Sequence, residues 1–300
     1  MQGNRRARIL LVFGTRPEAI KLAPVVKELE RRSEEFETIV CVTGQHREML
    51  EQVLSLFSIT PAYDLSTMRE NQSLEYITGH IIHEVSRVID QIEPDIVIVQ
   101  GDTTSTFAAS LAAFYQKTKV AHVEAGLRTL DKFHPFPEEI NRKLTSALAD
   151  IHFAPTEWAR SNLIREGYSS QTIHVVGNTV VDALSQIRGN NGRRRSQYSS
   201  KYCPNGEKLI LVTGHRRESF GKRFEDICKG LREISQEPDV QIVYPVHLNP
   251  NVREPVFRIL RDRSNIHLIE PLQYAEFIDL IEDSYLILTD SGGIQEEAPS

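Results

Sequence analysis

Short apolar segments of strand length alternate with helical patterns along the whole chain, and this alternation limits the fold more than any other feature. The clearest helical pattern lies between Leu74 and Ile92, where apolar side chains recur every three or four residues and predict a core-facing helix side. The predicted strands are residues 8–13, 38–42, 95–99, 120–123, 209–212, 240–243, 266–269 and 285–288. Such alternation predicts the α/β class, with parallel sheets covered by helices on both faces.

The length of 300 residues predicts two domains, because a single core seldom grows that large. Residues 188–206 lose the periodic pattern and are rich in polar residues and glycine, as interdomain linkers are. We therefore expect Rossmann-like domains at residues 1–187 and 207–300, joined by a linker at 188–206. The basic run at 193–195 is interpreted as a solvated surface rather than a phosphate patch. Because the chain stops at Ser300, in the first turns of a predicted helix, we expect the second domain to be truncated.

Composition excludes several classes of partner. The hydrophobic fraction of 40% is that of a folded globular protein, and the net charge of −6 provides no positive field for nucleic acid or an anionic membrane. The three cysteines form no Cys-x-x-Cys pair, which favours a reducing, cytoplasmic location. The apolar start at residues 9–13 is too short for a signal peptide, because Arg16 and Glu18 follow it closely. No apolar segment is long enough to cross a bilayer.

Polar or glycine-rich clusters follow the predicted strands at the points where those strands end. In open parallel sheets, ligands bind beyond the carboxyl ends of the strands, where helix N-termini offer free backbone N–H groups. The clusters are residues 14–18, 101–104, 124–128, 214–218, 247 and 290–297. Neither a Gly-x-Gly-x-x-Gly loop nor a Walker A lysine loop is present, so no nucleotide cofactor is predicted.

Three acidic residues of the first domain are candidates for proton transfer. Asp102 is either a crevice carboxylate or the N-cap of a helix that begins at Thr103. Glu124 ends an apolar strand before a glycine turn and is predicted to face the crevice, and Glu138 is either a first-turn helix acid or a third crevice carboxylate. Converging carboxylates have raised pKa values, as general acids and bases require. His122 lies on the same strand face as Glu124, but we interpret it as a buried strand histidine and predict no metal site.

Candidate anion contacts occur in both domains. Consecutive glycines at Gly292 and Gly293, after Ser291, would let backbone amides approach a phosphate, although a plain loop with a serine cap fits too. Arg16, beside a proline suited to the first helical position, is either a diphosphate contact or a surface arginine. His215 lies in a Gly-His-Arg-Arg-Glu turn that suits phosphate recognition or leaving-group stabilisation.

Seven ordered motifs together resemble the bacterial non-hydrolysing UDP-N-acetylglucosamine 2-epimerases, and the likeness extends from residue 8 to residue 300. The motifs are Phe-Gly-Thr-Arg-Pro-Glu-Ala at 13–19, Gly-Asp-Thr at 101–103, His-Val-Glu-Ala-Gly-Leu-Arg at 122–128, Pro-Glu-Glu-Ile-Asn-Arg at 137–142, Gly-His-Arg-Arg-Glu at 214–218, Pro-Val-His at 245–247 and Asp-Ser-Gly-Gly at 290–293. The resemblance implies a glycosyltransferase-B-like pair of Rossmann domains around a cleft. It also implies a homodimer that interconverts UDP-GlcNAc and UDP-ManNAc for surface polysaccharides, with no cofactor.

The resemblance also implies roles for single residues. The acid/base set would be Asp102, Glu124 and Glu138, with His215 assisting near the diphosphate. The substrate contacts would be Arg16, Lys21, Ser291, Gly292 and Gly293, with Phe277 beside the uracil and Glu297 on the ribose. A site for allosteric activation by the substrate itself would include Gln45, His46, Arg216 and His247.

The chemistry requires the anomeric bond to break before the stereocentre changes, because the carbon to be inverted has no neighbouring carbonyl to acidify its proton. Loss of UDP would acidify that proton, and 2-acetamidoglucal plus UDP would be the intermediate. Three alternatives stay open. They are a hydrolysing epimerase that releases ManNAc, a glycosyltransferase of the same fold, and a nucleotide-sugar binding module made inactive by truncation.

Overall fold

The structure is a computed structural model that describes residues 5–44, 47–66, 72–191, 197–214 and 220–298. The chain forms two compact units, Met1–Ala183 and Leu184–Ser300, and the division falls inside helix α7 (Thr179–Asn191). Within these described residues, no helix is both long and apolar enough to span a membrane.

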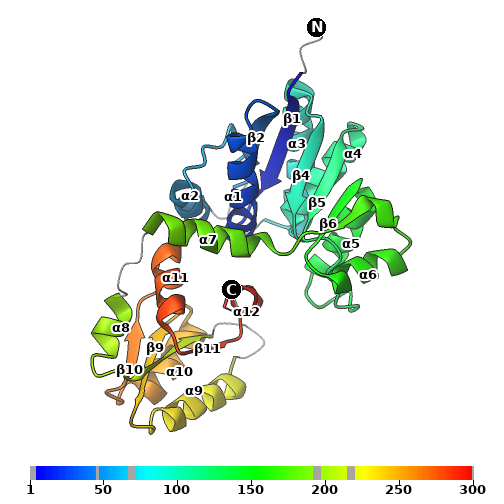
Figure 1. The fold of residues 1–300 in the computed structure, drawn as a ribbon. Coiled ribbons are helices and arrows are strands. Elements are labelled where there is room, and N and C mark those ends of the chain that lie inside the picture. The colour runs from blue at the N-terminus through cyan, green and yellow to red at the C-terminus, as the bar shows by residue number, and fades with distance from the viewer. Residues whose placement is uncertain (1–4, 45–46, 67–71, 192–196, 215–219, 299–300) are drawn as a thin grey trace. The chain divides into compact units, whose positions relative to one another are not determined.

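The first unit contains a parallel sheet of seven strands in the order β3-β2-β1-β4-β5-β6-β7 (Figure 1). Chain order reverses between β1 and β4, which makes this the switch point where doubly wound sheets bind ligands. The strands are β1 (Ala7–Phe13), β2 (Phe36–Val42), β3 (Tyr63–Asp64), β4 (Ile96–Gln100), β5 (Lys119–Val123), β6 (Ile151–Ala154) and β7 (Ile173–Val175). Each of the four strands predicted in this half of the chain is confirmed.

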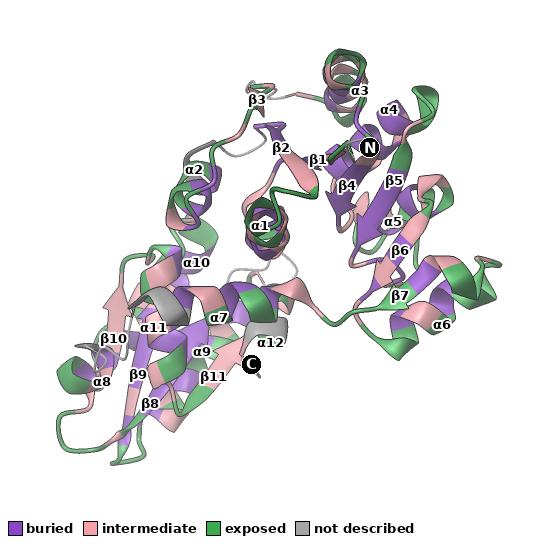
Figure 2. Ribbon diagram, turned by 45° about the horizontal axis from the view of Figure 1, so that its top comes forward, coloured by how far each residue is buried: buried purple, intermediate pink, exposed green. Residues whose placement is uncertain are grey.

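Helices cover both faces of this sheet, and the strands between them are mostly buried (Figure 2). The helices are α1 (Arg16–Arg31), α2 (Arg47–Leu56), α3 (Leu74–Ile92), α4 (Thr104–Tyr115), α5 (Glu138–Leu148) and α6 (Glu157–Arg165), and a short 3₁₀ helix spans Ser170–Thr172. The predicted stripe of α3 is confirmed, since Ile77, Ile81, Val85 and Val88 are buried. The alanine-rich helix α4 packs in the same core cluster, because small side chains allow close approach to the strands.

The second unit contains a parallel sheet of four strands in the order β10-β9-β8-β11. The strands are β8 (Lys208–Thr213), β9 (Val240–Pro245), β10 (Ile266–Ile269) and β11 (Leu286–Thr289), and all four were predicted. The helices are α9 (Lys222–Ile234), α10 (Pro250–Leu260), α11 (Tyr274–Asp283) and α12 (Gly292–Glu297). A separate core cluster includes Phe224, Ile242 and Val256, so each unit has its own hydrophobic interior.

The segment predicted to be a linker, residues 188–206, contains helical structure. Helix α7 continues into it as far as Asn191, and α8 (Gln197–Tyr202) lies within it. The aromatic residues Tyr198 and Tyr202 are buried, with relative exposures of 6% and 8%. Their burial stabilises α8 despite a local composition typical of a linker.

Candidate active site

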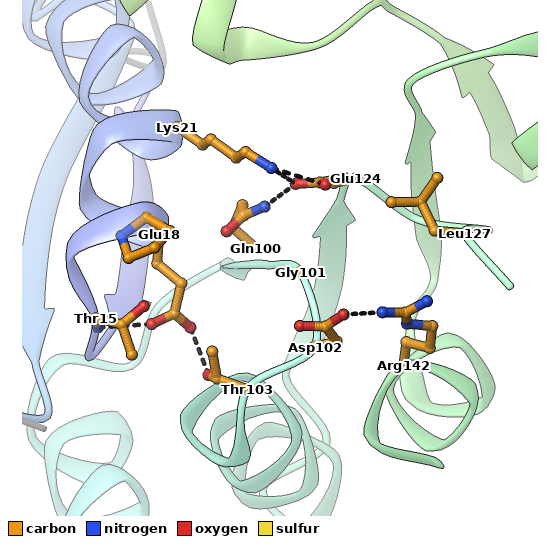
Figure 3. A pocket seen from close by; sticks show the side chains of 11 residues that line it. Thr15, Glu18, Lys21, Gln100, Gly101, Asp102, Thr103, Glu124, Leu127 and Arg142 are labelled. Atoms are coloured by element: carbon orange, nitrogen blue, oxygen red, sulfur yellow. Dashed lines mark hydrogen bonds and ion pairs between the residues drawn. The ribbon is translucent and has the colours of Figure 1, made fainter. Parts of the chain in front are cut away.

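A pocket of roughly 170 Å³ lies at the carboxyl ends of β1, β4 and β5, at the switch point of the first sheet (Figure 3). Its lining residues come from α1, α5 and the segments that follow these three strands. They are Thr15, Pro17, Glu18, Lys21, Gln100, Gly101, Asp102, Thr103, Glu124, Leu127 and Arg142. The pocket therefore gathers Lys21, Asp102 and Glu124, three of the residues singled out from the sequence.

Glu124 and Lys21 form an ion pair in this pocket. The Lys21 ammonium donates to both carboxylate oxygens of Glu124, at 2.8 and 2.7 Å, and the Gln100 side-chain amide donates to the same carboxylate. The two charged side chains are only 13% and 10% exposed. Glu124 has a φ of 65°, in the left-handed region that few non-glycine residues adopt. This turn conformation and the two donors orient its carboxylate in the pocket.

Asp102 pairs with a different cation, Arg142 of helix α5. The Asn141 side chain, from the same helix, donates to the backbone carbonyl of Asp102 at 3.0 Å. The alternative role of Asp102 as a helix N-cap is wrong, because Thr103 is the N-cap of α4 and its hydroxyl accepts the N–H of Thr106 at 3.1 Å. The carboxylate of Asp102 is thus directed to Arg142 rather than to the helix end.

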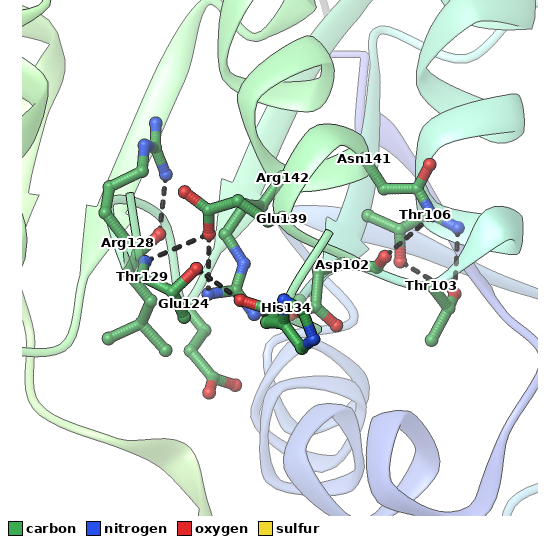
Figure 4. Close-up of polar contacts among 12 residues, drawn as sticks. Asp102, Thr103, Thr106, Glu124, Arg128, Thr129, His134, Glu139, Asn141 and Arg142 are labelled. Atoms are coloured by element: carbon green, nitrogen blue, oxygen red, sulfur yellow. Dashed lines mark hydrogen bonds and ion pairs between the residues drawn. The ribbon is translucent and has the colours of Figure 1, made fainter. Parts of the chain in front are cut away.

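Arg142 is itself held by Glu139, which has no exposed surface (Figure 4). The Glu139 carboxylate accepts the backbone N–H groups of Thr129 and Leu130, at 3.1 and 3.2 Å, and Arg142 donates to it at 3.3 Å. The two bonds from backbone N–H groups anchor the loop that precedes α5. Our sequence analysis missed Glu139 and Arg142, although their i, i+3 spacing on a helix was a usable signal.

Glu138, the third predicted carboxylate, opens helix α5 and is half-buried. It is not among the residues that line the pocket. Its Oε2 is buried and has no hydrogen-bond partner in the described part of the chain. The structure therefore brings Asp102 and Glu124 into one pocket and places Glu138 outside its lining.

Glu18 is a further acidic residue at the pocket, which sequence reasoning treated only as part of a motif. It is 2% exposed, and its Oε2 accepts the backbone N–H groups of Gly14 and Thr15 at 3.0 and 2.7 Å. Its Oε1 accepts the Thr103 hydroxyl at 2.6 Å and lies 2.9 Å from the Thr106 hydroxyl. Burial raises the pKa of Glu18, although these hydrogen bonds act in the opposite direction.

His122 is fully buried on β5, and its Nε2 lies 2.7 Å from the carbonyl oxygen of Gly101. Burial lowers the pKa of His122 to about 3, so the ring is neutral and its Nε2–H donates to that carbonyl. His122 is thus a buried strand histidine, but only its Nε2 is satisfied, because its Nδ1 is buried and has no hydrogen-bond partner in the described part of the chain. Among the residues with described positions, no group of three or more His, Cys, Asp or Glu is arranged to hold a metal ion.

Arg16 is the first residue of α1 and is half-buried, and the proline beside it occupies the predicted first turn.

In the second unit, Ser291 is the N-cap residue of α12 and makes no side-chain capping bond there. The Ser291 backbone N–H donates to the Thr289 hydroxyl at 2.9 Å, and Gly292 and Gly293 open the helix. The glycine turn thus follows a strand at the carboxyl edge of the second sheet, as predicted, but that strand, β11, is half-buried to exposed rather than buried.

Two further candidates lie elsewhere on the second unit. Phe277 is a half-buried residue of α11. His247 follows β9 and is exposed, and its Nδ1 accepts the N–H of Asn249 at 3.1 Å. The remaining sequence candidates, namely His215, Arg216, Gln45, His46 and the side chain of Glu297, lie outside what the structure describes.

The fold and the pocket together define a class of protein, an α/β protein of the glycosyltransferase-B-like type with carboxylates at a switch point. The crystal structure of MurG from Acinetobacter baumannii has the same fold, with a TM-score of 0.53, over 97% of this chain and 76% of that chain. The sequence identity is 13%, so this likeness concerns the fold alone.

Closer relatives identify the family. The family model described as UDP-N-acetylglucosamine 2-epimerase matches residues 27–300. The chain is 56% identical to the UDP-N-acetylglucosamine 2-epimerase of Yersinia pestis, over 98% of this chain and 79% of that protein. It is 50% identical to the enzyme of Neisseria meningitidis solved bound to UDP-GlcNAc, with a TM-score of 0.89 over 98% of this chain and 80% of that one. The chain belongs to the UDP-N-acetylglucosamine 2-epimerase family, and the resemblance read from its motifs is confirmed.

Proposed function

We propose that this chain reversibly converts UDP-GlcNAc to UDP-ManNAc without net hydrolysis. The observation that carries the proposal is the pocket at the first switch point. The carboxylates of Asp102 and Glu124 both line this pocket, and each is paired with a different cationic side chain. Relatives support the substrate, since the related structure from Methanocaldococcus jannaschii, at 35% identity, was solved with UDP-GlcNAc and UDP. That relative covers 97% of this chain, and this chain covers 81% of it, with a TM-score of 0.79.

The proposed reaction proceeds by elimination and re-addition. The bond between the anomeric carbon and the UDP oxygen breaks, and its electron pair leaves with UDP. The adjacent carbon then loses its proton to a carboxylate, and the C–H electron pair becomes the double bond of 2-acetamidoglucal. In the second half, UDP adds back to the anomeric carbon while a proton reaches the neighbouring carbon from the opposite face.

Two faces of the sugar require two proton-transfer groups, and a positioned acid or base contributes about a hundredfold to ten-thousandfold to the rate. We assign these roles to Asp102 and Glu124. Lys21 and Arg142 would hold the two carboxylates in place when no substrate is bound. By family resemblance, Glu138 is the third member of the acid/base set, and His215 assists near the diphosphate.

We further propose that the second unit binds the nucleotide. The Ser291 hydroxyl and the backbone N–H groups of Gly292 and Gly293 would donate to the diphosphate, because a helix N-terminus after a glycine turn suits an anion. Phe277 would lie beside the uracil and Glu297 on the ribose. Arg16, at the start of α1 in the first unit, would add a cationic diphosphate contact.

The biological setting is also inferred from the resemblance. It suggests a cytoplasmic homodimer that supplies UDP-ManNAc for surface polysaccharides. Substrate activation would involve Gln45, His46, Arg216 and His247. Size measurement by light scattering tests the dimer, and the dependence of initial rate on UDP-GlcNAc concentration tests the activation.

Incubation of the protein with UDP-GlcNAc in heavy water tests the proposed reaction. NMR should detect UDP-ManNAc and deuterium at the acetamido-bearing carbon of both sugar nucleotides. Free ManNAc as the product would instead indicate a hydrolysing epimerase, and turnover that needs an acceptor would indicate a glycosyltransferase. Binding of UDP-GlcNAc with no deuterium incorporation would contradict the proposal and leave a nucleotide-sugar binding module.

A further inference from the structure

The buried carboxyl group of Glu18 connects two turns of the pocket that are far apart in the sequence. One turn joins β1 to α1 and contributes the N–H groups of Gly14 and Thr15. The other joins β4 to α4 and contributes Thr103, the residue that directly follows Asp102. Glu18 therefore contacts the turn that carries a proposed catalytic carboxylate.

In the described part of the chain, the hydrogen-bond partners of Glu18 are backbone N–H and hydroxyl groups rather than cations. The nearby cations are already engaged, since Lys21 pairs with Glu124 and Arg142 pairs with Asp102. A buried carboxylate without a cation costs several kcal/mol, and a buried neutral acid avoids that cost. The surroundings thus favour the protonated form of Glu18.

The arrangement of hydroxyl groups around Oε1 also favours the protonated form of Glu18. The Thr103 oxygen accepts the N–H of Thr106, which leaves its own proton for Glu18. The Thr106 hydroxyl lies 2.6 Å from the carbonyl oxygen of Gln100, a group that can only accept, so its single proton is directed there. The 2.9 Å contact between Thr106 and Oε1 then requires a proton from Glu18. A carboxylic acid supplies that proton and satisfies every group in the cluster.

We propose that Glu18 is a positioning residue, which as a neutral carboxylic acid fixes the turn between β4 and α4 and so holds Asp102 in the pocket. The inference rests on the proposed function for the role of Asp102. Helix α5 holds the same turn from its other side, through Asn141 and Arg142. With Glu18 removed, the turn loses its hydrogen bonds to the turn between β1 and α1, and the Asp102 carboxylate moves relative to the reacting sugar.

Substitutions at Glu18 test the positioning role. In Glu18→Ala the turn loses its support, and kcat should fall about a hundredfold with KM changed by less than about threefold, because a displacement near 1 Å costs about that much. Glu18→Gln should restore part of the lost activity, since its amide N–H replaces the donated proton and its carbonyl still accepts from Gly14 and Thr15, whereas its amide nitrogen cannot accept the Thr103 hydroxyl. Glu18→Asp keeps the acidic group but shortens its reach, and should resemble Glu18→Ala. Unchanged kcat in Glu18→Ala would overturn the role, and a Glu18→Gln variant as inactive as Glu18→Ala would overturn the neutral form.

A matched pair at Thr103 keeps the test decisive if Glu18→Ala does not fold. Thr103→Val removes the hydroxyl and retains the shape, so kcat should fall about tenfold or more, in line with a lost hydrogen bond to a buried group. Thr103→Ser keeps the hydroxyl and should recover that loss. Equal activity of the two variants would contradict the connection through Thr103.

Infrared spectroscopy tests the protonation of Glu18 independently of turnover. The difference spectrum between the unsubstituted protein and Glu18→Gln at neutral pH should contain the C=O stretching band of a protonated carboxyl group. A difference band of an ionised carboxylate would overturn the neutral form. If the protein bound UDP-GlcNAc but never epimerised it, the proposed function would fail while this spectrum still reported on Glu18.

Discussion

The carboxyl edges of the two sheets differ in the groups that they present. At the first edge, two ion pairs line one pocket, Lys21 with Glu124 and Arg142 with Asp102. At the second edge, hydroxyl and backbone groups meet, as in the 2.6 Å contact between Thr213 and Thr289. Charged side chains that exchange protons suit bond making and breaking, whereas backbone N–H groups at a glycine turn suit an anion that is only held. Under the proposed function, the comparison assigns the chemistry to the first sheet and nucleotide binding to the second.

The ion pairs at the first edge need structural support. Removing charges from water is costly, so a nearly buried ion pair persists only when further hydrogen bonds fix its members. Gln100 supplies such a bond to Glu124, and Glu139 holds Arg142 against Asp102. The supporting residues are therefore as much a part of the first site as the proposed catalytic ones.

The largest expected effect is at the proposed catalytic carboxylates. Asp102→Asn and Glu124→Gln each remove a proton-transfer group, and kcat should fall by about a hundredfold to ten-thousandfold. Affinity for UDP should stay the same, because we assign nucleotide binding to the second unit. Steady-state rates and calorimetric titration with UDP measure the two quantities. Glu28→Gln, at an exposed carboxylate on α1, is the control. A normal rate for either variant would remove that residue from the mechanism.

The next effect concerns the support of Glu124. Lys21→Met leaves a nearly buried carboxylate without its cation, which should lower the unfolding free energy by about 3 kcal/mol and reduce kcat. Denaturant unfolding and steady-state rates provide the measurements. If Lys21→Met and wild type had the same unfolding free energy and the same kcat, the ion pair would support neither the fold nor the reaction.

A smaller effect is expected at the edge of the second sheet. Ser291→Ala removes a hydroxyl that we propose contacts the diphosphate. UDP affinity should fall by about tenfold or less, because one hydrogen bond is lost. The rate at saturating substrate should change less than the affinity. Ser284→Ala, which removes a hydroxyl bonded to the Leu280 carbonyl in the same unit, is the control. A large loss of kcat with unaltered UDP binding would contradict the assignment of nucleotide binding to the second sheet edge.

The smallest expected effect is on stability as a function of pH. Burial raises the pKa of Glu18 above its value in the unfolded chain, so its contribution is complete below the unfolded pKa and is lost as pH rises through the folded pKa. Glu18→Gln cannot ionise, so its unfolding free energy relative to wild type should increase with pH across that interval. Urea unfolding at a series of pH values measures the difference. A difference that decreased with rising pH would indicate an ionised Glu18.

Sequence reasoning predicted eight of the strands and missed β3, β6 and β7. Strands β1, β4 and β8 are apolar over most of their length, and such runs are readable without a structure. Strand β3 has two residues and β7 has three, two of them exposed, so neither leaves a periodic signal. Their existence depends on pairing with β2 and β6 rather than on local sequence.

The same distinction between local sequence signals and tertiary contacts applies to the residues of the site. Asp102 and Glu124 were predicted because each directly follows a strand, which is a local feature. Glu18 was missed because its importance comes from Thr103, 85 positions away in the chain. Arg142 likewise contacts Asp102 across 40 positions. A single sequence indicates which side chains lie at a sheet edge, but their pairing is set by tertiary contacts.

The central claim is that the anomeric bond breaks before the stereocentre becomes labile. It is tested by UDP-GlcNAc that carries a heavy oxygen isotope at the position bridging the sugar and the diphosphate. The account predicts that NMR will detect this isotope moving into the non-bridging oxygens of the same phosphate during turnover, because UDP is free to rotate before it adds back. Steady formation of UDP-ManNAc with the isotope always retained in the bridge would contradict it.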